Sequence, residues 1–375
     1  MTIPAGTEKV KLMLLDTVSL APLMPAEEKI LAAVNNDPFA GDDEINVVFL
    51  GDSIYAGSGA SSVDNRWVTK VGKWFEETYE DEDTQVNWYN KGVGGTTSHY
   101  SLVRMERDVL DLNPDMVFVT MTPNDGNADT SREMESVLRT LQELDNPPYV
   151  VKTYFTNRSW RVSPGYGNKV AAHYGIDVYD DTEDLKADIA ATGRTVEDYF
   201  ADSTHPNNAG YEVIANGIIR WLSTNRHFKK PYNAEKLVDN AVTMVESKFI
   251  NAEDETEVTR DGSWEAGDNY LQSSAEGDSL VFYFTGNFIA FEHGLHKNSG
   301  RYEVYVDDEL VMTGNPRYND SITSFQKVCK GDSTNIDLPD GEHVVEIKTI
   351  ACPATIAPED YVLRLYDIIV GTVKR

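Results

Sequence analysis

Apolar residues occur along the first part of the chain in short runs, of which Val47-Val48-Phe49-Leu50 is free of any polar interruption. Such a run is typical of a strand that is covered on both faces of a parallel sheet. Apolar-rich runs predict five strands, at 47–50, 85–89, 116–121, 149–155 and 176–179. Apolar residues at helical spacing predict helices at 66–79, 102–110, 132–144 and 209–225. This alternation predicts a flavodoxin-like, three-layer α/β/α domain with a parallel sheet.

The pattern changes after Pro231, where short runs of alternating apolar and polar residues are separated by Gly, Asn and Asp. These runs predict strands at 248–251, 280–284, 288–292, 302–306, 344–347 and 363–370. Many short strands with turn residues between them favour an antiparallel β-sandwich or jelly roll. We therefore expect a lead-in segment (1–43), an α/β domain (44–230) and an all-β accessory domain (231–375) that is either structural or carbohydrate-binding.

Composition limits the classes of partner. The 375 residues suffice for about two domains, each with its own core. The chain carries 62 acidic and 33 basic residues, a net charge of −29, which repels nucleic acid and anionic lipid. Cys329 and Cys352 could pair with each other, but two cysteines do not fix a redox compartment.

The N-terminal stretch 9–16 is basic and then apolar, but Asp16 ends the apolar run after four residues. That run is too short for a signal peptide, and no later run approaches the length of a membrane helix. We expect a soluble protein without membrane insertion, while the compartment (cytoplasm, the outside of the cell by another route, or a virion) stays open.

A candidate nucleophile follows the first predicted strand, in Gly51-Asp52-Ser53. In open α/β sheets ligands bind at the carboxyl ends of the strands, which is where Ser53 would lie. The tripeptide Gly-Asp-Ser also begins at Gly277 and Gly331. The copy at Gly277 precedes an alternating strand and is typical of a hairpin turn, so we favour Ser53 over Ser279. The pairs Asn319-Asp320 and Asp340/His343 lie in the same β-rich region, so we also favour turns over catalytic motifs there.

Three further polar motifs accompany Ser53. The stretch Asn90 to Thr97 is rich in glycine, so its backbone can approach a ligand closely. Thr122-Pro123-Asn124-Asp125 follows the third strand and offers the amide of Asn124. In Asp202-Ser203-Thr204-His205 the histidine could accept a proton from a serine while the aspartate fixes its tautomer. Each motif alone also fits an ordinary loop, whereas their joint occurrence favours an active site.

The four motifs, in this order over about residues 45–225, resemble those of the SGNH or GDSL hydrolases. The resemblance implies that Ser53 is the nucleophile, His205 the general base and Asp202 the acid that orients it. It also implies an oxyanion hole formed by the N–H groups of Ser53 and Gly95 and the side-chain amide of Asn124.

Two positions depart from the family pattern: Ile54 stands where Leu is usual, and Thr122 stands where the third motif has glycine. We further expect Asp52, Asn90 and Asp125 to bind the substrate. Serine chemistry requires no cofactor and no metal ion, and we expect neither. His293 and His296 are spaced like metal ligands, but with no third ligand we expect them to decorate the surface.

The leading hypothesis is a serine esterase that removes short acyl groups, above all acetyl, from a carbohydrate or polysaccharide. The carbohydrate part rests on the predicted β-sandwich, which resembles accessory modules of carbohydrate esterases. Trp88, Tyr100, Trp160 and Tyr166 could provide rings that stack on sugars.

Two alternatives remain open. One is a lysophospholipase, thioesterase or arylesterase of the same fold. The other is a phage or cell-surface protein that binds a glycan receptor, which could assemble as a homo-oligomer or on a virion. The presence of Ser53, Asp202 and His205 together favours catalysis over pure binding.

Overall fold

The structure is a computed structural model that describes residues 39, 43–120, 124–125, 131–160, 166–224, 233, 235–317, 322–329, 334–335, 337–351 and 361–375. Several sequence-based expectations fall outside these ranges. They are nearly all of the lead-in segment, the pair Asn319-Asp320, the third Gly-Asp-Ser copy at Gly331 and the pairing partner Cys352.

The first domain is built on a parallel sheet whose strands have the order β2-β1-β3-β4-β5. Its strands are β1 (Glu44–Gly51), β2 (Gln85–Gly92), β3 (Met116–Val119), β4 (Tyr149–Tyr154) and β5 (Asp177–Asp180). The four apolar residues Val47 to Leu50 are completely buried, as their uninterrupted run predicts. The flavodoxin-like order is confirmed, and the point where it reverses lies beside β1.

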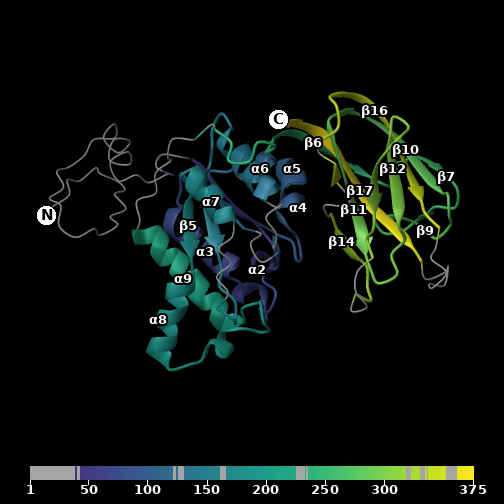
Figure 1. Cartoon of the computed structure of the whole chain (residues 1–375). Coiled ribbons are helices and arrows are strands. Elements are labelled where there is room, and N and C mark those ends of the chain that lie inside the picture. The colour runs from purple at the N-terminus through teal and green to yellow at the C-terminus, as the bar shows by residue number, and fades with distance from the viewer. Residues whose placement is uncertain are drawn as a thin grey trace.

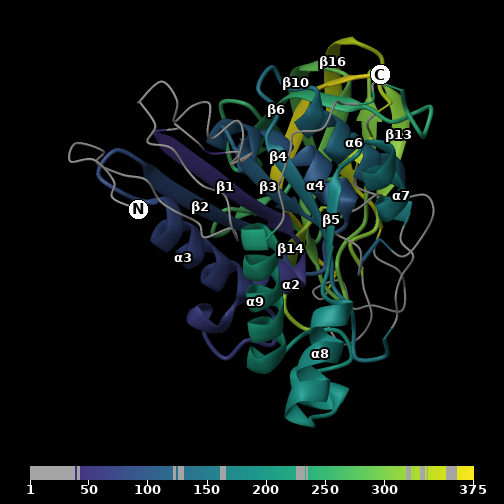
Figure 2. The same cartoon turned by 90° about the vertical axis from the view of Figure 1, so that its left-hand side faces the viewer.

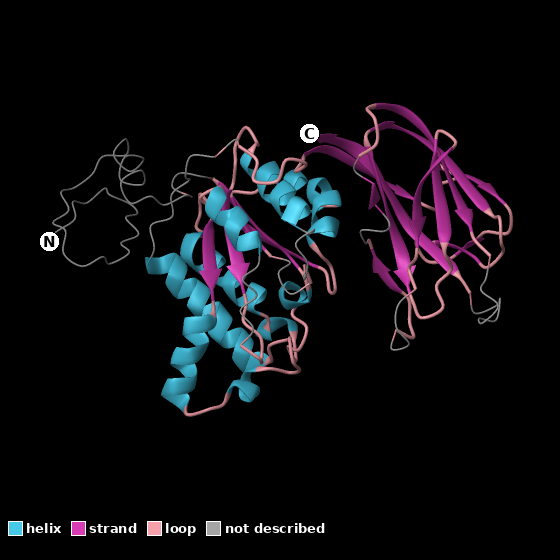
Figure 3. Cartoon of the chain, viewed as in Figure 1, coloured by secondary structure: helices cyan, strands magenta, loops and turns pink. Residues whose placement is uncertain are grey.

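Helices cover both faces of this sheet (Figure 3). They are α2 (Ser53–Ala56), α3 (Trp67–Tyr79), α4 (Ser98–Val103), α5 (Met105–Asp108), α6 (Ser131–Gln142), α7 (Tyr166–His173), α8 (Thr182–Thr192) and α9 (Asn208–Thr224), with 3₁₀ turns η1 (Val63–Asn65), η2 (Leu110–Leu112) and η4 (Val196–Tyr199). Phe49 and its face of the sheet pack with α3 and α9. Val48 and Leu50 pack on the opposite face with α4 to α7. Figure 2 looks onto the α3 and α9 side.

The second domain consists of two antiparallel sheets, which confirms the predicted all-β unit. One sheet has the order β13-β12-β16-β10-β7, and the other contains β14-β11-β17-β9-β8 with β6 paired to β17 and β15 to β11. The strands are β6 (Thr243–Asn251), β7 (Thr259–Asp261), β8 (Glu265–Ala266), β9 (Leu271–Ser273), β10 (Ser279–Gly286), β11 (Phe288–Leu295), β12 (Tyr302–Val306), β13 (Glu309–Gly314), β14 (Gln326–Val328), β15 (Thr334–Asn335), β16 (Gly341–Thr349) and β17 (Leu363–Lys374).

The two domains share one apolar core. The strands β6, β11 and β17 lie beside α4, α5 and α6 (Figure 1), and Met244, Phe288 and Ile369 belong to the same buried cluster as Val103 and Met105. Hydrogen bonds reinforce this contact, such as the one from Met244 N–H to Thr140 Oγ1 at 2.9 Å. In the part of the chain that the structure describes, no helix is both long and apolar enough to span a bilayer.

Candidate active site

Ser53 is the first residue of α2 and lies at the carboxyl end of β1. Asp52 caps this short helix, because its Oδ1 accepts a hydrogen bond from Ile54 N–H at 2.9 Å. Ser53 is buried to all but 7% of its surface. The sharp change from strand to helix therefore presents the hydroxyl at the sheet edge where open α/β sheets bind ligands.

His205 and Asp202 lie on the loop before α9 and meet Ser53 in one chain of hydrogen bonds. The distance from His205 Nε2 to Ser53 Oγ is 2.9 Å, and that from His205 Nδ1 to Asp202 Oδ2 is 2.7 Å. The loop is held from within, since Asp202 Oδ1 accepts hydrogen bonds from the backbone N–H groups of Thr204 and His205. Pro206 pairs with Phe200, which closes the loop against η4.

The charge of Asp202 is stabilised by this arrangement. Burial alone would raise its pKa, but the hydrogen bonds from His205 and Thr204 outweigh burial and bring the pKa down to about 2. Asp202 is therefore a carboxylate at neutral pH. A carboxylate accepts the Nδ1 proton of the imidazole and leaves the lone pair of Nε2 directed at Ser53 Oγ.

The glycine-rich loop passes beside the serine. A Cβ placed on Gly94 would lie 3.7 Å from Ser53 Cβ, and Gly95 has a φ of +73°, a conformation that favours glycine. At Gly92, a Cβ would lie 2.3 Å from the backbone nitrogen of Ala56 in α2, so only glycine permits this approach. The loop thus brings the backbone of Gly94 beside Ser53 and that of Gly92 onto α2.

Asn124 joins the same loop. Its Nδ2 donates a hydrogen bond to the carbonyl oxygen of Thr96 at 2.8 Å, which fixes the amide beside Gly95. A side-chain amide carries two N–H groups, and Thr96 takes one of them. This hydrogen bond holds the side chain of Asn124 to the glycine-rich loop, and the oxyanion-hole roles of Gly95 and Asn124 stay a prediction.

The side chains of Asp125 and Asn90 form hydrogen bonds with backbone groups of neighbouring segments. Asp125 accepts a hydrogen bond from Ser98 N–H at 2.9 Å and a short one from Ser98 Oγ, at the beginning of α4. Asn90 donates to the Tyr55 carbonyl at 2.9 Å and accepts from Gly92 N–H at 2.9 Å. Whether these residues also contact a substrate, as the sequence predicts, stays a prediction.

Two buried carboxyl groups lie beneath the loops. Burial raises the pKa of Asp52 to about 7, because its capping hydrogen bond only partly offsets the loss of water and Asp125 repels it. Burial likewise raises the pKa of Asp125 to about 6, against the hydrogen bonds from Ser98. Asp52 is completely buried, so its carboxyl group interacts with neighbouring groups of the protein rather than with solvent.

The aromatic residues proposed for sugar stacking are not gathered at one place. Trp88 packs on α3 and donates its indole N–H to Glu76 at 2.7 Å. Tyr100 is only 3% exposed and lies in the interface between the domains, so it offers no ring to a sugar. Trp160 packs against the cluster around Tyr199. The side chain of the fourth candidate, at position 166, lies outside the described side chains.

The competing motifs of the second domain are structural. Ser279 begins β10, and Asp278 accepts hydrogen bonds from Ser263 and Ser273. The surface position expected for His293 is wrong, since it is completely buried and contacts Tyr302 Oη at 2.9 Å. Within the described ranges, no three histidine, cysteine or carboxylate side chains are placed to bind a metal ion.

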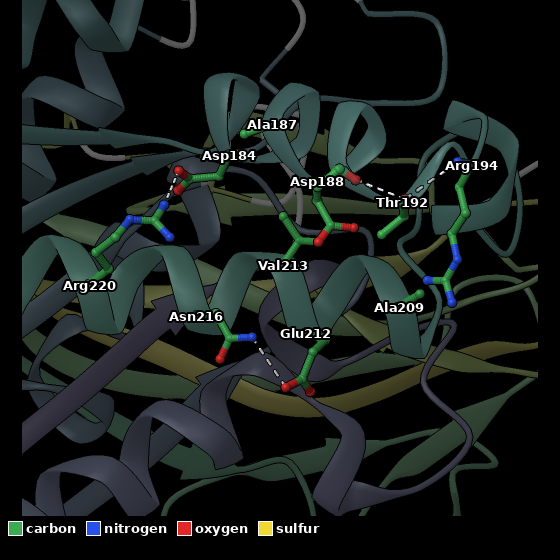
Figure 4. Close-up of a pocket in the computed structure, with 11 residues that line it drawn as sticks. Asp184, Ala187, Asp188, Thr192, Arg194, Ala209, Glu212, Val213, Asn216 and Arg220 are labelled. Atoms are coloured by element: carbon green, nitrogen blue, oxygen red, sulfur yellow. Dashed lines mark hydrogen bonds and ion pairs between the residues drawn. The ribbon is translucent and has the colours of Figure 1, made fainter.

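A cavity of about 660 Å³ lies away from this site, between α8 and α9 (Figure 4). Its wall carries charged side chains that already have partners: Arg220 is paired with Asp184, and Asn216 donates to Glu212. Ser53, His205 and Asp202 are not among the residues that line this cavity. We assign it no part in the chemistry.

Sequence reasoning missed two residues that shape the site. Ser98 ties the start of α4 to Asp125, and the fully buried Arg104 donates to the carbonyl of Gly51 at 3.3 Å. Ser98 could have been noticed as a polar residue at a helix start. Arg104 has a local partner in Asp108, but its hydrogen bond to Gly51, 53 positions away, leaves no signal in the sequence.

Comparison with known proteins gives a family and a fold. The GDSL-like Lipase/Acylhydrolase family matches residues 49–213. Among solved structures, a two-domain esterase active on acetylated mannans superposes with a TM-score of 0.70 at 21% identity, over 92% of this chain and 95% of that chain. The same esterase co-crystallised with mannopentaose gives 0.71 at 20% identity, over 92% and 94%. No curated protein matches the sequence.

Proposed function

Because residues 49–213 form a domain of the GDSL-like lipase/acylhydrolase family, a family of carboxylic ester hydrolases, we propose that this protein is a serine esterase that removes acetyl groups from a carbohydrate. Ser53 is its nucleophile, His205 its general base and Asp202 the acid that orients the histidine. The observation that carries this assignment is the hydrogen-bond chain from Asp202 Oδ2 through the imidazole of His205 to Ser53 Oγ.

The reaction proceeds in two halves. Serine is a weak nucleophile at its own pKa, so His205 Nε2 takes the hydroxyl proton as Ser53 Oγ bonds to the acetyl carbon. His205 then gives that proton to the departing sugar oxygen, and the acetyl group stays on Ser53. Water repeats the sequence: His205 takes its proton, its oxygen bonds to the acetyl carbon, and Ser53 regains the proton as acetate leaves.

The negative oxygen of each tetrahedral intermediate needs donors that are already in place. The N–H groups of Ser53 and Gly95 and the second amide N–H of Asn124 serve this purpose. Two observations support this assignment: the backbone at Gly95 has a positive φ that favours glycine, and the contact with Thr96 ties the amide of Asn124 to the glycine-rich loop. Donors that need no reorganisation during the reaction stabilise the transition state most effectively.

The choice of an acetylated carbohydrate rests on architecture. The superposition with the esterase active on acetylated mannans covers 92% of this chain, which is more than the hydrolase domain alone would give, and 95% of that two-domain esterase. Polysaccharides bearing acetyl esters are therefore the first substrates to test. A similarity in fold is an association, so the substrate needs its own experiment.

The test is the hydrolysis of p-nitrophenyl esters from acetyl to octanoyl by the wild type and by Ser53→Ala. We expect activity confined to the shortest chains and a loss of at least about 10⁴-fold in kcat for the variant, with an unchanged melting temperature. Release of acetate from acetylated mannan and acetylated xylan then identifies the sugar.

Three outcomes would change the assignment. Activity that rises with chain length would indicate a lipid or thioester substrate. Full activity in Ser53→Ala together with loss in Ser279→Ala would move the nucleophile to the second domain. A wild type inactive on every ester, with retained affinity for a glycan, would indicate a binding protein.

A further inference from the structure

Glu292 of β11 is a completely buried carboxylate at the contact between the two domains. From the α/β domain it accepts a short hydrogen bond from Tyr100 Oη and lies 3.8 Å from Arg107. From its own domain, Lys327 Nζ lies 2.5 Å from its Oε2. A buried charge is tolerated only when it is paired and hydrogen-bonded, and two of these three partners belong to the α/β domain.

Each carboxylate of this buried network is met by at least one cation. Lys327 also contacts Asp367 at 2.5 Å, while Asp108 of α5 accepts from Arg104 at 2.7 Å and from Arg107 at 2.9 Å. The network runs without interruption from β17 and β14 through Glu292 into α4 and α5. Removing one charge from such a network leaves an uncompensated partner in a medium that cannot solvate it.

Through Arg104, the network also contacts the turn between β1 and α2 that carries Ser53. Arg104 lies over the ring of Tyr100 at 5.1 Å and donates to the carbonyl oxygen of Gly51. That same carbonyl accepts a hydrogen bond from Val93 N–H at 2.9 Å. Gly51 comes two residues before Ser53, so one oxygen atom links the buried network, the glycine-rich loop and the strand that carries the serine.

Tyr100 also belongs to the helix that begins directly after the glycine-rich loop. Ser98, two residues earlier, is tied to Asp125, and Asn124 is tied to Thr96. The first turn of α4 is therefore fixed on one side by the loop that carries Asn124 and on the other by Glu292. A shift of α4 would move Thr96 and Gly95 together.

We propose that Glu292 is a positioning residue of the active site: from the second domain it holds α4 and Arg104, and through them the glycine-rich loop and the Ser53 turn, in the geometry required for ester hydrolysis. The second domain is then part of the catalytic unit rather than a detachable sugar-binding module. This inference rests on the proposed function at Ser53.

The experiment uses the full chain with Glu292→Gln and Tyr100→Phe. Glutamine removes the charge to which the Tyr100 hydroxyl is hydrogen-bonded and which faces Lys327, and phenylalanine removes that hydroxyl. A displacement of about 1 Å at reacting groups can cost about 10²-fold, so we expect each variant to lower kcat on p-nitrophenyl acetate by roughly ten-fold with KM within about two-fold of the wild type. The double variant should fall no further than the worse single one, because both break one link.

Rates are expressed per active site, counted by covalent labelling of the serine with a fluorophosphonate, so that unfolded protein does not contribute. The matched control is Asp337→Asn. Asp337 is another carboxylate of the second domain that pairs across the interface, with Arg132 at 2.8 Å, but it is exposed and its partner belongs to α6 rather than to α4. It should keep the wild-type kcat.

The outcomes separate this inference from the proposed function. An active wild type with both variants at wild-type kcat per labelled site, whatever their melting temperatures, would reduce Glu292 to a structural residue. Strictly additive losses in the double variant would also overturn the link. If Glu292→Gln does not fold, the kcat of Tyr100→Phe per labelled site tests the inference by itself. A wild type that hydrolyses no ester would instead overturn the proposed function itself.

Discussion

The two domains each contain an aspartate–histidine pair of the same local geometry. In the α/β domain, His205 Nδ1 lies 2.7 Å from Asp202 Oδ2, and in the β domain, His343 Nδ1 lies 2.7 Å from Asp307 Oδ2. Both aspartates use their second oxygen to accept a backbone N–H, that of His205 or that of Val344. By the pair alone, the two histidines could not be told apart.

What distinguishes the two is the atom that faces the second ring nitrogen. His205 Nε2 faces the hydroxyl of Ser53 at 2.9 Å, whereas His343 Nε2 faces the carbonyl oxygen of Pro339 at 2.9 Å. A carbonyl only accepts, so His343 is held between two acceptors and favours a proton on both nitrogens. Burial works against that charge, but the contacts with Asp307 and Pro339 outweigh it and raise the pKa of His343. A general base must face a group that can give up a proton. Of these two histidines, His205 faces such a group and His343 does not.

The largest expected effect tests this difference directly. We expect His205→Gln to lower kcat on an acetyl ester by at least about 10⁴-fold, because the variant removes the base that faces the hydroxyl of Ser53. His343→Gln should leave kcat per labelled active site unchanged. Kinetics on p-nitrophenyl acetate, with Ser279→Ala as a second control in the β domain, measure both effects. Comparable losses in the two histidine variants would show that the β-domain pair takes part in the chemistry.

An intermediate effect is expected for Asn124→Ala. The variant removes one donor to the oxyanion and leaves the serine and histidine in place, so kcat should fall by about 10²- to 10³-fold with little change in KM. Steady-state kinetics give both constants, and a thermal melt shows whether the loop with Thr96 still folds. A loss confined to KM would assign Asn124 to ground-state binding instead.

Much of the fold could be predicted from the sequence because the parallel strands are buried on both faces and therefore apolar without interruption. Helix α8 was not predicted, since Leu185 is its one buried residue and leaves no clear apolar stripe. The predicted helix 102–110 is instead divided at Arg104 into α4, α5 and the turn η2. The division falls at the buried Arg104, whose hydrogen bond to the carbonyl of Gly51 only the folded chain provides.

The site was predictable to the extent that its motifs are local. Asp202 and His205 are three residues apart, and Ser53 directly follows a strand whose burial the sequence reveals. Contacts such as Tyr100 with Glu292, 192 positions apart, depend on how the domains pack and leave no local signal. The burial of His293 was missed for a similar reason, because β11 is buried along its whole length: one face packs in the β-sandwich and the other against the α/β domain.

The smallest expected effect concerns stability and its dependence on pH. Because the folded pKa of His343 lies above its unfolded value of 6.5, the folded state binds the proton more tightly. The contribution of this pair to the free energy of unfolding is therefore complete below pH 6.5 and is lost as the pH rises through the folded pKa. Relative to the wild type, His343→Gln should cost about 1–3 kcal/mol at pH 5.5, the range of hydrogen bonds to a charged group, and less at pH 9.

Urea unfolding of the wild type, His343→Gln and Asp307→Asn across this range measures the change. The loss of stability caused by Asp307→Asn should fall with rising pH in the same way, since this variant removes the carboxylate that stabilises the imidazolium. A destabilisation by His343→Gln that stays constant from pH 5.5 to 9 would mean that the imidazole is neutral in the fold. The β-domain pair would then hold its proton no more firmly than a free histidine, and the contrast with His205 would rest on the missing hydroxyl alone.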